Sequence, residues 1–160
     1  MLKFTRWGVT CGAGNGFEDR APFPRTEQAG GDLFVRQEPA PLTRHLRVRQ
    51  ERGHTVLEFC GEIDLAAASE IAPHLDRETD RPAARVVIDL SGIEFFDCSG
   101  LRLLYRARSR VLDRDGHLLL VCAHPLTLRV LRITGLSRLL PPQPTLDAAL
   151  EQPEATSGSL

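Results

Sequence analysis

The alternation of hydrophobic and polar residues predicts that the ordered part of the chain begins with a β-hairpin. Residues 42–49 alternate Leu46 and Val48 with basic residues, and residues 54–60 alternate in the same way. Such a period of two is typical of strands with one buried face. The intervening residues 51–53, Glu-Arg-Gly, can form the turn.

The residues after the hairpin predict a first helix. Gly61 is expected to end the second strand, and Asp64 has a side chain suited to an N-cap, so the helix is expected to begin at Leu65. Pro73 is expected to kink or end this helix, because proline lacks the amide that bonds one turn back. The polar residues 76–84 then indicate a loop.

A continuously apolar run at 85–90 predicts a strand in the middle of the sheet, covered on both faces. Ser91 and Gly92 are expected to turn the chain. A helical period follows, with its apolar positions at Gly100, Leu103, Leu104, Ala107 and Val111. The opposite face is interpreted as solvated rather than as a binding site, and it carries Arg102, Arg106, Ser109, Arg110 and Asp113.

The rest of the pattern predicts a strand at 117–122 and a helix from Pro125 that ends at Gly135. A weak strand at 137–140 and a short helix at 145–151 complete the series. Because strands that alternate with helices require a mostly parallel sheet, the predicted fold class is an α/β sandwich. It has a mixed sheet of four to five strands, an antiparallel edge hairpin and helices packed against the sheet.

The two ends of the chain show no such period. Residues 1–41 are rich in glycine and proline and predict a flexible N-terminal extension, residues 42–151 predict one domain, and residues 152–160 predict a disordered tail. The GAGNG segment at 12–16 could suggest a phosphate-binding loop. A linker is favoured, because no convincing strand precedes the segment and no periodic helix follows it.

Charge and hydropathy exclude several classes of partner. The chain has 20 Lys and Arg against 21 Asp and Glu, so direct binding to nucleic acid is not expected. The longest apolar run, 118–123, is too short to cross a membrane, and the first ten residues lack the apolar stretch of a secretory signal. These observations predict a cytoplasmic protein that does not bind membranes.

The chain lacks the motifs of an enzyme or a metalloprotein. No P-loop, no GxSxG elbow and no HExxH motif is present, and the five histidines lie at no diagnostic spacing for a triad. Cys122, His124 and Cys98 could approach a metal ion, but a second paired ligand is missing. We therefore expect no catalysis, no cofactor and no metal. The four cysteines lack CxxC spacing, so no disulfide framework is expected, and they are Cys11, Cys60, Cys98 and Cys122.

The start of the second helix carries the most marked group of polar residues. With Asp97 as the N-cap, Cys98 and Ser99 occupy the first two helical positions, where backbone amides lack partners and the helix dipole is positive. Ser99 is then expected to present its hydroxyl outward beside Asp97. Capping alone would also explain these residue types, since Asp and Ser are common at helix starts.

Four segments of the chain together resemble the STAS domain, and specifically the bacterial anti-sigma factor antagonists. They follow the family's order across 42–150 and read GEID, VVIDLSGIEFFDCSGL, GHLLLVCAHPLTLRVL and ITGLSRLL. The resemblance implies partner switching in transcription regulation. The unphosphorylated protein would bind an anti-sigma factor of the GHKL serine kinase type and free a sigma factor. Phosphorylation of Ser99 would reverse the binding, and a PP2C-type phosphatase would reset the switch.

The same resemblance implies a set of partner-binding residues, which are Asp64, Asp97, Cys98, Ser99, Gly100 and Arg102. For Asp64, the capping role explains the residue type equally well. Cys98 replaces the family's usual hydroxyl residue, which leaves Ser99 as the phosphate acceptor and places an oxidisable thiol at the helix start. Arg102 replaces a small residue and could reach a phosphate on Ser99 or an acidic patch on the partner.

One alternative within the family stays open. The chain could be a STAS module that is never phosphorylated and that serves as a sensor or scaffold in a stress-signalling complex. Incubation with the cognate kinase and ATP would then leave Ser99 unmodified. The sequence also leaves open the oligomeric state and the role of residues 1–41.

Overall fold

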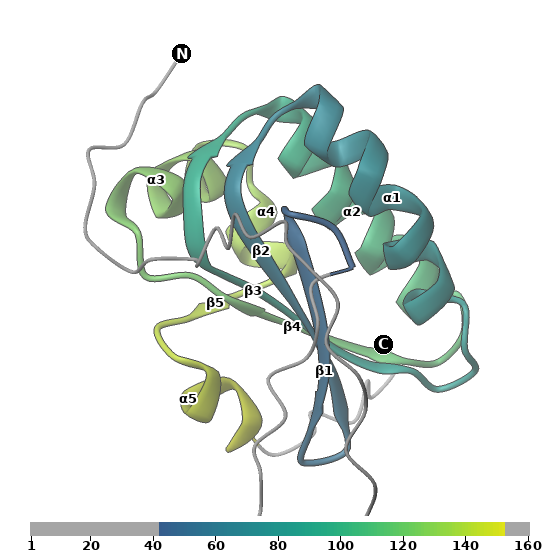
Figure 1. The fold of residues 1–160 in the computed structure, drawn as a ribbon. Helices are drawn as coiled ribbons and strands as arrows, with labels where there is room; N and C mark the ends of the chain where they lie inside the picture. The colour runs from purple at the N-terminus through teal and green to yellow at the C-terminus, as the bar shows by residue number, and fades with distance from the viewer. Residues whose placement is uncertain (1–41, 153–160) are drawn as a thin grey trace, which may run out of the picture.

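A computed structural model describes residues 42–152, which form a five-stranded sheet with helices packed on it (Figure 1). The order of the strands in the sheet is β1-β2-β3-β4-β5. The extension predicted at 1–41 and, apart from Gln152, the tail predicted at 152–160 lie outside the described residues. Both therefore stay predictions.

The strands are β1 (Leu46–Glu51), β2 (His54–Ile63), β3 (Arg85–Phe96), β4 (His117–Val121) and β5 (Pro142–Gln143). The helices are α1 (Leu65–Thr79), α2 (Cys98–Leu112), α3 (Pro125–Ile133), α4 (Leu136–Leu139) and α5 (Leu146–Leu150). β1 pairs antiparallel with β2, and every later pairing is parallel. The predicted α/β sandwich with an antiparallel edge hairpin is confirmed.

The strands β2 and β3 are longer than the sequence predicted. The prediction that Gly61 ends β2 is wrong: the residue has φ +72° and lies inside the strand, where the register with β3 shifts. A β-bulge thus accommodates the left-handed conformation that glycine tolerates. The turn expected at Ser91 and Gly92 is also wrong, because both residues lie within β3. A Cβ atom at Gly92 would lie 3.2 Å from the Phe59 carbonyl oxygen, so glycine permits the close approach of the two strands.

Pro73 does not end α1, and the strand predicted at 137–140 is wrong. α1 continues through Pro73 to Thr79, and Pro73 and Ser69 are exposed, so water can bond the carbonyl that the proline leaves free. The segment 137–140 is not a strand, because residues 136–139 form α4. The last strand falls instead on Pro142–Gln143 at the edge of the sheet, where a missing proline amide is tolerated.

The helices divide between the two faces of the sheet. The larger core lies under α1 to α4 and contains sheet residues such as Leu57, Ile88 and Leu120. The smaller core lies on the opposite face, where Val56, Val87, Leu119 and Val121 pack with Ala149 of α5. β3 is therefore covered on both faces, as its continuously apolar sequence predicted. No helix within residues 42–152 is long and apolar enough to cross a membrane.

Candidate functional site

The heads of α1 and α2 lie side by side at one edge of the sheet. Ile63 at the end of β2 pairs in parallel with Phe96 at the end of β3, so the next residues, Asp64 and Asp97, are neighbours. In Figure 1 both helices begin at the upper end of the sheet. The structure therefore brings the two segments that carry most of the predicted site residues to the same place.

Both aspartates cap their helices. Asp64 Oδ1 accepts a hydrogen bond from the Ala67 amide at 2.9 Å, and Asp97 Oδ1 accepts one from the Ser99 amide at 2.7 Å. The predicted starts of the two helices, at Leu65 and Cys98, are confirmed. The carboxylates satisfy amides that lack intrahelical partners and lie where the helix dipole favours negative charge.

The predicted outward orientation of Ser99 is wrong. Its side chain is only 7% exposed, whereas the adjacent Cys98 is exposed. The reason is the helical period: Ser99 lies four residues before the buried Leu103 and shares its inward face, while Cys98 is rotated by about 100°. The Ser99 hydroxyl forms no hydrogen bond with any residue of the described range 42–152.

Gly100 lets the aromatic ring of Phe96 pack against the first turn of α2. A Cβ atom at Gly100 would lie 2.4 Å from a ring carbon of Phe96, far inside van der Waals contact. Gly100 is buried, as the predicted apolar stripe required. This residue therefore has a packing role, which does not depend on contact with a partner.

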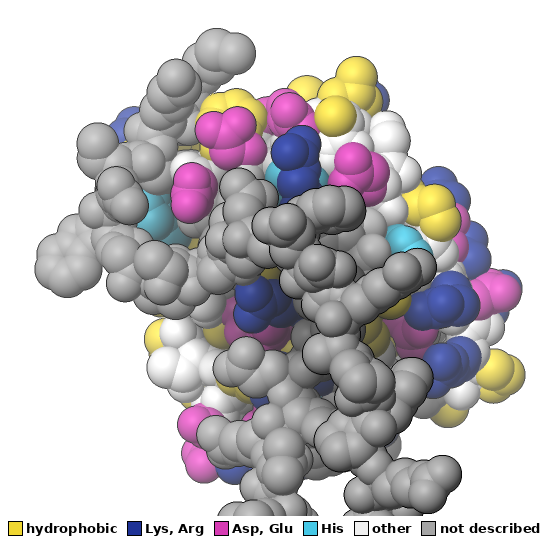
Figure 2. All heavy atoms as spheres, viewed as in Figure 1, with side chains coloured by type: hydrophobic (Ala, Val, Ile, Leu, Met, Phe, Trp, Pro, Cys, Tyr) yellow, Lys and Arg dark blue, Asp and Glu magenta, His cyan; other side chains and the backbone are white. Residues whose placement is uncertain are grey.

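Acidic side chains surround this helix head. Glu62 and Glu94, near the ends of β2 and β3, are exposed, and they flank the capping carboxylates Asp64 and Asp97. Leu65, at the start of α1, is 67% exposed. We call these five residues the acidic rim. In Figure 2 several acidic side chains lie on the upper part of the molecule, with basic and hydrophobic side chains among them.

The carboxylates of the acidic rim have no internal counterions. None of the four forms an ion pair with any residue between 42 and 152. Arg102, on the second turn of α2, is exposed and is likewise free of ion pairs in that range. Sequence reasoning missed Leu65 and Glu94 as parts of this surface. The paired ends of β2 and β3 were the available signal, but the strand lengths were underestimated.

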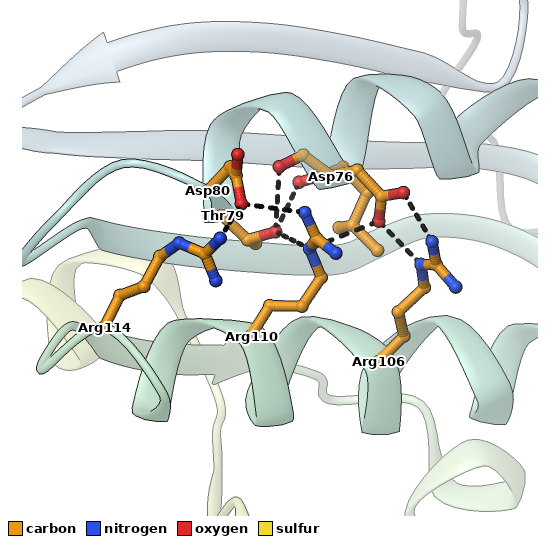
Figure 3. Close-up of polar contacts among 7 residues, drawn as sticks. Asp76, Thr79, Asp80, Arg106, Arg110 and Arg114 are labelled. Carbon is orange, nitrogen blue, oxygen red and sulfur yellow. Dashed lines mark hydrogen bonds and ion pairs between the residues drawn. The ribbon is translucent and has the colours of Figure 1, made fainter.

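The other end of α1 and α2 is cross-linked by ion pairs, drawn in Figure 3. Arg106 binds Asp76 through two nitrogens at 2.6 and 2.5 Å, and Arg110 donates to Asp80 at 3.0 Å. Arg114 also pairs with Asp80. The hydrogen bond from Arg106 holds the pKa of Asp76 below its ordinary value. The prediction of a merely solvated arginine face is therefore wrong for Arg106 and Arg110.

The described cysteines differ in their surroundings. Cys98 is exposed, whereas Cys60 and Cys122 are buried. Desolvation raises the pKa of the Cys122 thiol to about 11. Within residues 42–152 no group of three His, Cys, Asp or Glu side chains is placed to hold a metal ion. Cys11 and the GAGNG segment lie outside the described residues.

Comparisons with known proteins assign this fold to one family. The model of the STAS domain matches residues 45–149. The anti-sigma-F factor antagonist RsfB of Mycobacterium tuberculosis is 32% identical over 112 residues, which cover 69% of this chain and 90% of RsfB. The crystal structure of an anti-sigma factor antagonist from Mycobacterium paratuberculosis matches with a TM-score of 0.59 at 34% identity, over 66% of this chain and 89% of that one.

A further match is shorter. Rv2638 of Mycobacterium tuberculosis, whose name assigns it to the anti-anti-sigma factors, is 35% identical over 65 residues. These residues cover 41% of this chain and 44% of Rv2638, so the chain spans less than half of that relative. RsfB is named as an antagonist and Rv2638 as an anti-anti-sigma factor, which agrees with the prediction of a non-catalytic protein. The chain belongs to the STAS domain family, and within it to the anti-sigma factor antagonists.

Proposed function

We propose that this chain regulates transcription by partner switching. The unphosphorylated form binds an anti-sigma factor of the GHKL serine kinase type in the cytoplasm and thereby frees a sigma factor during a stress response. The kinase phosphorylates Ser99, which ends the binding, and a PP2C-type phosphatase restores the first form. The acidic rim, together with Cys98, Ser99, Gly100 and Arg102, forms the surface that the anti-sigma factor contacts.

The observation that carries this proposal is the position of Ser99. It lies on the first turn of α2, beside the head of α1, in a chain of the antagonist family. A phosphate adds about 1.5 to 2 negative charges. At a helix N-terminus that charge is locally favourable, so the modification leaves the domain folded.

The effect of the phosphate therefore falls on the interface. Burying an unpaired ion costs several kcal/mol even after relaxation, and the carboxylates of Asp97 and Glu94 add repulsion between like charges. A complex of micromolar affinity has about 8 kcal/mol of binding free energy in total. One phosphate on Ser99 is thus sufficient to release the partner.

The low exposure of Ser99 adds a step to this mechanism. Phosphoryl transfer requires the acceptor hydroxyl to lie in line with the phosphate that it attacks. A side chain that is 7% exposed must first move outward. The terminal turn of a helix opens at small free-energy cost, so we place this opening in the complex with the kinase.

Two variants of Ser99 test the proposal by calorimetry with the cognate anti-sigma factor. Ser99→Ala is expected to keep full affinity, and Ser99→Asp is expected to weaken binding by roughly 30-fold, about 2 kcal/mol, because it buries a charge. Ser109 is an exposed serine later on the same helix. The control variant Ser109→Asp should bind within about twofold of wild type, since surface changes away from an interface have small effects. Equal affinities of the two Ser99 variants would contradict the proposal that a negative charge at Ser99 releases the partner.

The burial of Ser99 also favours a second candidate function. A STAS module that is never phosphorylated would serve as a sensor or scaffold in a stress-signalling complex, and it would have no need of an accessible hydroxyl. Intact-mass analysis after incubation with the anti-sigma kinase and ATP separates the two functions. A gain of one phosphate that is absent from Ser99→Ala supports the switch. Tight binding without any gain in mass supports the scaffold.

A further inference from the structure

A second exposed apolar surface lies over α2, α3 and α4, on residues that the proposed switch does not use. Three of the six large hydrophobic side chains exposed within 42–152 belong to it, namely Tyr105, Ile133 and Leu139. Ile133 is 75% exposed and Leu139 is 48% exposed. Tyr105 donates its hydroxyl hydrogen to the Thr134 carbonyl at 3.2 Å, which joins α2 to the end of α3.

The same surface is positively charged. Arg108 of α2 donates to the Leu139 carbonyl at 3.2 Å. Arg132 and Arg138 are exposed and form no ion pair with residues 42–152, and the sequence has no acidic residue between 125 and 146. We call this surface the α4 face, and it consists of Tyr105, Arg108, Arg132, Ile133, Arg138 and Leu139.

The arginines of the α4 face differ from those of the ion-paired end of α2. There Arg106, Arg110 and Arg114 all reach carboxylates of α1. Four carboxylates without internal counterions lie on the acidic rim, together with the exposed Leu65. The described part of the chain therefore has two surfaces that each combine exposed aliphatic side chains with charges that form no internal ion pair, and the charges of the two surfaces are opposite.

We propose that the α4 face of one copy docks the acidic rim of a second copy of this chain. Arginine and carboxylate groups form the strongest charge-assisted hydrogen bonds between side chains. Leu65 and Ile133 supply the apolar contact at the centre. Because the two surfaces are different, the contact is head-to-tail and generates rings or open chains rather than a two-fold dimer.

This association has a consequence for regulation. The acidic rim of a docked copy is covered, so that copy cannot present the head of α2 to any other protein. At high concentration, self-association thus prevents part of the protein from binding another partner through the acidic rim. The inference does not depend on phosphorylation or on an anti-sigma factor, since both surfaces are on this chain.

Sedimentation velocity of the full chain alone tests the proposal across a concentration series. At low ionic strength the weight-average sedimentation coefficient is expected to rise with concentration beyond the value of a dimer. The rise should be smaller at 0.5 M salt, because salt screens the charges. The Debye length falls from about 10 Å at 0.1 M ionic strength to about 3 Å at 1 M. A coefficient that stays at the monomer value at every concentration would overturn the proposal and assign the α4 face to another protein.

Charge reversal supplies the decisive comparison. Arg132→Glu with Arg138→Glu gives the α4 face a net negative charge like that of the rim. Glu62→Arg with Glu94→Arg cancels the negative charge of the rim, since Asp64 and Asp97 remain, and leaves the α4 face basic. Each double variant alone is expected to be monomeric, with a dissociation constant raised on the order of tenfold or more, because like charges meet in the first variant and the opposite charges are lost in the second. An equimolar mixture should associate again, because the unaltered rim of one variant then meets the unaltered α4 face of the other.

The matched control reverses two arginines outside both surfaces, Arg47→Glu with Arg52→Glu, and should associate like wild type. Thermal melts establish that the variants are folded; all the reversed rim and α4-face positions are exposed. Association of either rim or face variant alone, or failure of the mixture to associate, overturns the proposal. The anti-sigma binding of Ser99→Ala is measured separately, so the two proposals fail independently.

Discussion

The two ends of the α1–α2 pair use charge in opposite ways. At the carboxyl ends of the helices, Asp76 and Asp80 of α1 face the arginines of α2 and pair with them. At the amino ends, Asp64 and Asp97 accept hydrogen bonds from backbone amides, and Glu62 and Glu94 face solvent. At one end of the two helices Asp76 and Asp80 are satisfied by ion pairs, while at the other end the carboxylates are available to a second molecule.

This difference separates a part of the domain that stabilises it from the part that we propose recognises a partner. Ion pairs between neighbouring helices contribute modestly to stability. Unpaired carboxylates on an exposed rim contribute little to folding, but they select partners by charge. Substitutions at the two ends should therefore have separable effects on stability and on binding.

The largest expected effect on stability comes from a glycine at the carboxyl end. A Cβ atom at Gly116 would lie 2.6 Å from the Ala84 carbonyl oxygen, so backbone must shift. We expect Gly116→Ala to lower the free energy of unfolding by about 2 kcal/mol in urea denaturation. Gly100→Ala at the amino end meets the side chain of Phe96 and gains about 1 kcal/mol of helix propensity. Its net loss should be smaller, and the reverse order would contradict this account of the packing.

Removal of a charge at the carboxyl end should affect stability alone. Asp76→Asn breaks the contacts with Arg106 and Arg110, and we expect it to cost about 1 kcal/mol at neutral pH. Asp113→Asn, an exposed acid without an ion pair in the described range, is the control and should stay within about 0.5 kcal/mol. Neither variant should alter binding to the anti-sigma factor.

The pH dependence of the same variant follows from the lowered pKa of Asp76. A carboxyl group whose pKa is lower in the folded state stabilises the protein above its unfolded pKa, and this contribution disappears as pH falls through the folded pKa. The difference between wild type and Asp76→Asn should therefore be full above about pH 4 and shrink below it. Urea denaturation at a series of pH values measures this difference, and a constant gap down to pH 2 would exclude the ion pair as its source.

Truncation of the exposed leucine at the amino end should affect binding alone. Leu65→Ala is expected to weaken anti-sigma binding by up to about fivefold, or about 1 kcal/mol, and to leave the melting temperature nearly unchanged. Leu112→Ala removes another exposed leucine, at the carboxyl end of α2, and should leave affinity unchanged. Equal losses of affinity in the two variants would mean that the rim is not a distinct surface.

The last prediction concerns chemical labelling of the cysteines, where the smallest effect on the protein is expected. At pH 8 iodoacetamide should modify Cys98 in the folded protein and leave Cys122 intact, since burial raises the pKa of Cys122 to about 11. Peptide mass mapping identifies the modified residues, and labelling in urea, where Cys122 should also react, is the control. Modification of Cys122 as fast as Cys98 would show that the end of β4 opens as readily as the head of α2.

Local sequence patterns were sufficient to predict much of the fold. The period of two in the hairpin, the continuous apolar run of β3 and the capping residues Asp64 and Asp97 each act through near neighbours. Errors arose where neighbouring strands set the outcome. Gly61 and Gly92 look like strand ends in the sequence, but they form bulges and close contacts between β2 and β3. Pro142–Gln143 becomes a strand only because β4 offers it an edge.

The candidate site likewise combines features that the local sequence determines with features that only the tertiary structure determines. The sequence alone determined the helix head, its capping aspartate and its serine, because capping and helical period are local properties of the chain. Only the tertiary structure decided that Ser99 is covered while Cys98 is exposed, that the arginines of α2 pair with α1, and that unpaired carboxylates gather at one edge. These outcomes depend on which distant segments become neighbours, and no local pattern of residues specifies that.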